Sequence, residues 1–179
     1  MPLTQPLSEP LALAELDPSC VVRPPRNANT WFGDHFGVPM PRGLRHQADA
    51  MSWEGFVDAY GQTAGRLRLR HWKCADAERP AARLGVQARN YRAMISVDES
   101  VSTSTAVASG PIAALTAMLH ERGITIETLK FHQMTSSECT ATFIWGSNGT
   151  RAEWAMGLAD DPTQSALSAL IACGNRLMD

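Results

Sequence analysis

The chain has 179 residues, of which 44% are hydrophobic and 19% are charged, and its formal net charge is -2. This composition is that of a globular protein with one domain and appendages, and it excludes a disordered chain. The charge balance argues against a nucleic-acid-binding protein, and no apolar run reaches the roughly 18 residues that span a bilayer.

The four cysteines and the N-terminal sequence both bear on the compartment. The cysteines are far apart and form no Cys-x-x-Cys pair, which favours reduced thiols over a disulfide framework. The first ten residues, MPLTQPLSEP, lack the basic and apolar segments of a secretory signal. The sequence therefore predicts a cytoplasmic protein that binds neither membrane nor nucleic acid.

The first third of the chain is rich in proline and glycine. Residues 1–30 hold six of the eleven prolines and are predicted to form an irregular arm. Residues 31–64 are predicted to form a small, linker-like subdomain that consists mostly of loops. It contains one short helix, WEGFVDAYG, for which Ser52 is the expected N-cap.

From residue 65 to residue 179 the pattern changes to strands and helices. Three strand-like segments are followed by a helix that begins at Pro111, and the order then repeats, with a second helix beginning at Pro162. The strand-like segments are RLRLRHWK, ARNYRAMISVD and SVSTSTAVA, then ITIETLKFH, TATFIW and RAEWAMGL. The prediction is an α+β domain of two βββα repeats, in which the strands form a sheet with the helices on one face.

The residue patterns supply no catalytic or metal-binding constellation. The five histidines form no His-x-His or His-Glu-x-x-His motif, and no nucleophile elbow or phosphate-binding glycine loop is present. Arg66, Arg68 and Arg70 alternate with leucines, and we interpret them as a solvated or interface face. We therefore predict no catalytic residue, no metal and no cofactor.

The turn before the first repeat's helix stands in a longer pattern that resembles a known family. Gly110-Pro111 starts the helix, Phe131-His132 lies in the next strand, and Met156-Gly157, Asp160 and Asn175-Arg176 follow in order. From about residue 66 to residue 177, this order is similar to the C-terminal regulatory domain of 2-isopropylmalate synthases and the related citramalate synthases. The segments HFGVPMPRGLRHQ and SWEGFVDAYG resemble the linker that precedes that domain.

The resemblance implies a dimer in which the feedback inhibitor, leucine, or isoleucine in some relatives, lies at the interface. It implies these ligand-binding residues: Gly110, Pro111, Ile112 and Ala113 at the helix start, and Phe131, His132, Thr135 and Glu138 in the next strand and loop. Helix N–H groups suit the carboxylate of an amino acid, and Glu138 is expected to meet its ammonium group. Apolar side chains on both faces of the segment from Ala141 to Trp145 are consistent with the dimer.

The resemblance also implies what the chain lacks. The synthases' catalytic barrel has no counterpart here, so we expect a non-catalytic domain that modulates a partner synthase. Two alternatives remain open at this point. The first alternative to the regulatory domain is a ligand-free scaffold for dimerisation or protein interaction. The second is an enzyme that uses His132 and Glu138 as an acid–base pair.

Overall fold

The computed structural model of the protein describes residues 27–76 and 87–179. Both βββα units are present, which confirms the α+β class and the repeat. The first unit consists of β1 (Leu67–Cys74), β2 (Arg89–Val97), β3 (Ser100–Ala108) and α4 (Pro111–His120). The second consists of β4 (Glu127–Thr135), β5 (Thr140–Ser147), β6 (Ala152–Ala159) and α5 (Pro162–Met178). Each unit forms its own antiparallel three-stranded sheet, in the orders β1-β2-β3 and β4-β5-β6.

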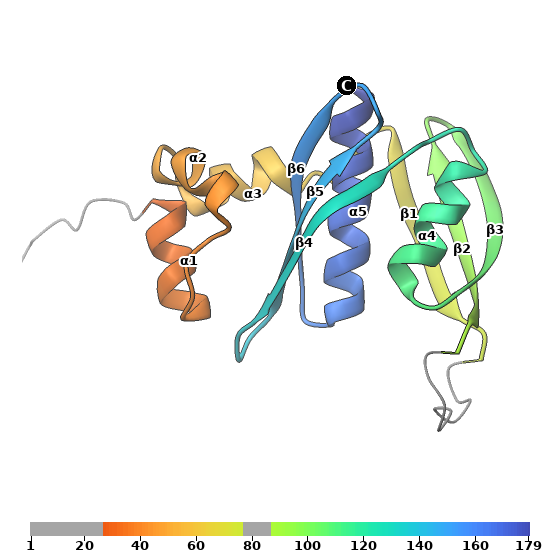
Figure 1. Ribbon diagram of the computed structural model, residues 1–179, viewed down its shortest axis with the longest axis horizontal. Helices are drawn as coiled ribbons and strands as arrows, with labels where there is room; N and C mark the ends of the chain where they lie inside the picture. The colour runs from red at the N-terminus through yellow and green to blue at the C-terminus, as the bar shows by residue number, and fades with distance from the viewer. Residues whose placement is uncertain (1–26, 77–86) are drawn as a thin grey trace, which may run out of the picture.

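Helix α5 lies between the two sheets and joins them into one core (Figure 1). It packs on β6 and β5 with one side and reaches β1 and α4 with the other, while α4 packs on β3 and β2. Apolar side chains of both helices face this core, where Leu115, Met118, Leu167 and Leu170 are fully buried. Burying four such side chains contributes roughly 1.5–3 kcal/mol each, so the contact with α5 is a major source of stability.

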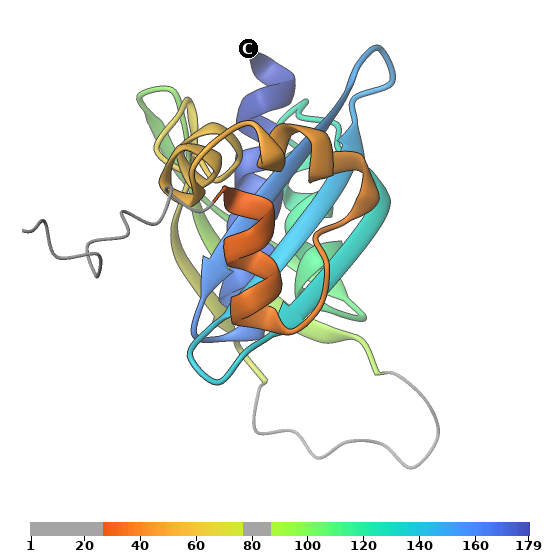
Figure 2. The same cartoon turned by 90° about the vertical axis from the view of Figure 1, so that its left-hand side faces the viewer.

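The other face of the β4-β5-β6 sheet is covered by the N-terminal helices (Figure 2). These are α1 (Ala28–Phe36), the 3-10 helix η1 (Arg42–Leu44), α2 (Arg45–Asp49) and α3 (Trp53–Tyr60). Phe32 and Phe56 pack with Phe143 and Met156 in a second core, and all four are fully buried. The apolar side chains on both faces of β5 are thus covered within one chain, which removes them as an argument for a dimer.

Helix α1 corrects two predictions, because it begins inside the expected arm and replaces much of the expected loop. The Asn27 side chain accepts a hydrogen bond from the N–H of Thr30 at 2.8 Å, and Gly37 ends the helix with φ 68°. Helix α1 buries Phe32 and Phe36, which are one turn apart, against the β4-β5-β6 sheet. The glycines and prolines indicated loops, but Asn27 and Gly37 are cap residues, and that signal in the sequence was available. The predicted arm before residue 27 lies outside the described residues.

Asn175, near the end of α5, fixes this helix to the start of β1. Its side-chain Oδ1 accepts from the N–H of Leu67 at 2.8 Å, and its Nδ2 donates to the carbonyl of Leu67 at 2.9 Å and of Gln62 at 3.2 Å. Asn175 is buried, and Gly65 lies so close that a Cβ there would be 2.5 Å from Asn175 Oδ1. The side chain therefore pairs with β1 as the backbone of another strand would.

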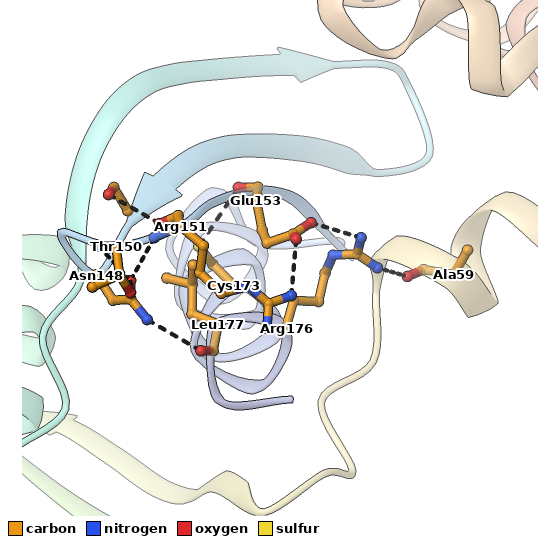
Figure 3. A network of polar contacts seen from close by, with 9 residues as sticks. Ala59, Asn148, Thr150, Arg151, Glu153, Cys173, Arg176 and Leu177 are labelled. Carbon is orange, nitrogen blue, oxygen red and sulfur yellow. Dashed lines mark hydrogen bonds and ion pairs between the residues drawn. The ribbon is translucent and has the colours of Figure 1, made fainter.

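Arg176 ties the same end of α5 to the N-terminal helices and to β6 (Figure 3). Its guanidinium donates to the carbonyl of Ala59 at 2.5 Å and to Glu153 at 3.0 Å, and it lies 4.7 Å from the centre of the Tyr60 ring. Burial alone would raise the pKa of Glu153, but the hydrogen bonds and charges of Arg151 and Arg176 hold that pKa below its usual range. The network joins three parts of the fold at one point.

Candidate ligand-binding site

The predicted turn into α4 forms with Gly110 as the N-cap residue and Pro111 as the first helical residue. In α1, α3 and α5 the N-cap side chains of Asn27, Ser52 and Asp161 each accept a hydrogen bond from the first turn. Gly110 has no side chain to do so, and α4 has no side-chain cap. The first N–H groups of α4, at the positive end of the helix dipole, are therefore open to an external acceptor.

The space in front of Gly110 is also open. A Cβ built on Gly110 would meet no atom within 4 Å among the described residues. Its φ of -168° is ordinary extended backbone, which any residue adopts. Neither packing among the described residues nor backbone conformation therefore accounts for a glycine at this position. The free space in front of it is consistent with a close approach by a ligand.

An apolar hollow of ≈ 580 Å³ lies along the exposed side of α4. Ala113, Thr116, Ala117 and His120 line it from the helix, and residues 125–128 line it from the turn into β4. Of the predicted site residues, Ala113 opens onto this hollow. The other three residues were not predicted, although their spacing of three and four places them on one helix face, away from the buried Leu115 and Met118.

Strand β4 is an edge strand whose side chains are exposed on both faces from Glu127 to Gln133. Phe131, 45% exposed, lies opposite Ile144 on the face toward α5, and Gln133 on the same face donates to the carbonyl of Pro162 at 2.8 Å. His132 points to the other face, where its ring stacks on Trp154 at 6.0 Å between centroids. The adjacent predicted residues Phe131 and His132 therefore face opposite sides of the sheet.

The last two predicted residues lie at and beyond the end of β4. Thr135 Oγ1 is 3.2 Å from Thr140 Oγ1, across the strand pair. Glu138, in the hairpin before β5, places its carboxylate 3.6 Å from His35 Nε2 of α1. Figure 1 shows this hairpin on the side of α1, with α4 on the opposite side of α5.

Within a single chain, the eight predicted residues therefore lie in separate groups. Gly110, Pro111, Ile112 and Ala113 are contiguous at the start of α4, which packs mainly on β3, β2 and α5. Phe131 shares the α5-facing side of β4 with Thr135, whereas His132 and Glu138 contact Trp154 and His35. The start of α4 can bind a carboxylate, and the proposed acid–base pair of His132 and Glu138 is divided between two different partners.

Three further observations concern the cysteines, metal binding and membrane-spanning helices. Cys74, Cys139 and Cys173 are free thiols, and Cys20 lies outside the described residues. Within residues 27–76 and 87–179, no three histidine, cysteine or acidic side chains gather closely enough to hold a metal ion. No helix in the described part of the chain is long and apolar enough to cross a membrane.

Comparison with known proteins shows a partial similarity to an enzyme. No protein-family model matches the chain. The chain is 27% identical over 136 residues to a 2-isopropylmalate synthase from Renibacterium salmoninarum. The aligned part is 69% of this chain but 22% of the relative, so the chain spans about a fifth of that enzyme's length. The chain is therefore distantly similar to one region of the synthase.

Proposed function

We propose that this chain is a non-catalytic regulatory-type domain that binds leucine or another small branched-chain amino acid between two copies of itself. In this proposal, the bound amino acid modulates a partner synthase that supplies the catalytic barrel. The partial similarity to a 2-isopropylmalate synthase and the βββα repeat support the relation to such a domain.

The open N-terminus of α4 is the observation that supports ligand binding. Gly110 leaves the first N–H groups without a side-chain acceptor and leaves free space in front of them. Helix N-termini of this kind bind carboxylates through N–H groups and the helix dipole. Ile112 and Ala113 stand beside that position and suit an aliphatic side chain.

In the proposed dimer, the second copy covers surfaces that are open in a single chain. The hollow beside α4 is apolar and β4 is exposed along most of its length, so both are surfaces that another protein surface can cover. We propose that the dimer joins these surfaces so that Phe131 of the partner subunit lies near the start of α4. Glu138 remains the predicted partner of the ammonium group. A ligand held between two copies can regulate only if it binds one arrangement of the dimer more tightly than another.

One observation favours the alternative of a scaffold without a ligand. Glu138 faces His35 of its own chain at 3.6 Å, which directs it toward α1 and away from α4. In that alternative, the dimer surfaces have the same role, and the start of α4 is an ordinary helix end.

Calorimetric titration with leucine, isoleucine and valine separates the two functions. We expect at least one of them to bind, and leucinamide, which lacks the carboxylate, to bind at least tenfold more weakly. Gly110→Asp places a carboxylate on the chain itself, as a favourable N-cap, so it should abolish binding while the thermal midpoint stays equal or rises. Absence of heat with all three amino acids at millimolar concentration would favour the scaffold.

A further inference from the structure

The β1-β2-β3 sheet has one face that no described helix covers. Leu67, Ala93 and Ile95 point from this sheet into the core beneath α4 and α5. The two helices that pack on this sheet, α4 and α5, lie on this core side. On that open face β1 and β2 present basic side chains, whereas α1, α2 and α3 cover the corresponding face of the other sheet with apolar ones.

Two cations face each other on this open surface. Lys73 of β1 and Arg92 of β2 are direct cross-strand partners, and both side chains are exposed. Like charges at such a position destabilise a sheet. Neither residue forms a hydrogen bond or an ion pair with another residue of the described ranges. The nearby acid Asp76 has another partner, since it accepts a hydrogen bond from the N–H of Asn90 at 2.9 Å.

The pair borders a hollow of ≈ 260 Å³ in the sheet surface. Its lining residues in the described part of the chain are His71, Lys73, Arg92, Ala93, Met94 and Thr103, and no carboxylate is among these. His71 lies opposite Met94, one register step from the cation pair, and Met94 lies opposite Thr103 on the next strand. The walls of the hollow are mostly apolar, and Lys73, Arg92, His71 and Thr103 are the residues that offer it polar groups.

We propose that this hollow binds the phosphate group of a small phosphorylated molecule. A phosphate monoester carries a charge of about -1.5 to -2 at pH 7, which matches Lys73 and Arg92 together, whereas a carboxylate would leave one cation unmatched. Arginine binds phosphate oxygens through its planar fork, and lysine binds them as a point charge. The bound phosphate would also relieve the repulsion between the two cations. This site is separate from the start of α4 and does not depend on amino-acid binding there.

Thermal unfolding in 0–10 mM inorganic phosphate, at constant ionic strength set by NaCl, tests the proposal. We expect the midpoint of the wild-type protein to rise by ~2 °C or more, because a ligand of the native state stabilises it. Lys73→Gln and Arg92→Gln should remove this rise, and without phosphate each should unfold at the wild-type midpoint or above it. Acetate at the same ionic strength should give no rise.

Arg70→Gln is the matched control. Arg70 lies on the same strand, but it borders a different hollow, beside Gln164 and Ser168 of α5. The control variant should keep the phosphate response. The proposal is overturned if the wild-type midpoint does not move, if the Lys73 or Arg92 variant responds as the wild type does, if acetate acts equally, or if Arg70→Gln loses as much. The last result would indicate a diffuse positive field and no defined site.

Discussion

Asn175 shows how a single side chain can complete the fold at a position where no strand is available. Its amide satisfies both the N–H and the carbonyl of Leu67, at a separation of 108 residues along the chain. Nothing local in the sequence indicates a partner so distant. By contrast, the roles of Pro111 and Pro162 as first helical residues depend on neighbouring residues, and for that reason they could be predicted.

We expect Asn175→Ala to lower the free energy of unfolding by about 2–3 kcal/mol, because it leaves the buried backbone groups of Leu67 without partners. Urea denaturation measures the change. Asn29→Ala, which removes a more accessible hydrogen bond to Asp49, should cost less than about 1 kcal/mol. Equal losses in the two variants would show that Asn175 has no special role.

At the scale of elements, alternation and helical spacing predicted all six strands together with α3, α4 and α5. They did not predict α1, because Gly33 within it and Gly37 after it obscured the spacing of Phe32 and Phe36. Nor could they predict how α5 meets β6. Gly157 of β6 lies directly beneath α5, where a Cβ would be 2.0 Å from the carbonyl oxygen of Ser165 and 2.5 Å from the nitrogen of Ala169. Such a contact becomes visible only when the elements are packed.

Gly157→Ala should therefore destabilise the protein by about 2–3 kcal/mol, since the backbone of α5 would have to move. The measurement is again the free energy of unfolding in urea. Gly33→Ala is the control, because Gly33 lies within α1 with no atom within 4 Å of an added Cβ, and alanine should stabilise that helix by roughly 0.5–1 kcal/mol. A Gly157→Ala protein as stable as the wild type would contradict the close packing of α5 on β6.

At the scale of the whole molecule, the proposed function depends on the surfaces that remain uncovered. The N-terminal helices cover one sheet face, yet β4 and the hollow beside α4 remain open. The predicted site residues lie at the start of α4, along β4 and in the hairpin beside α1. The candidate residues could be chosen from the sequence by resemblance. Their distribution over two sides of α5 could not, since it depends on how the two units pack.

The mass of the protein in solution, measured by multi-angle light scattering, tests the proposed dimer most directly. We expect twice the chain mass of 19.5 kDa. We expect a single chain mass for Ala117→Glu, which puts a charge into the hollow beside α4, and a dimer for the control Ala59→Glu on the exposed side of α3. A wild-type mass of one chain, with millimolar leucine present as well as absent, would rule out the proposed dimer.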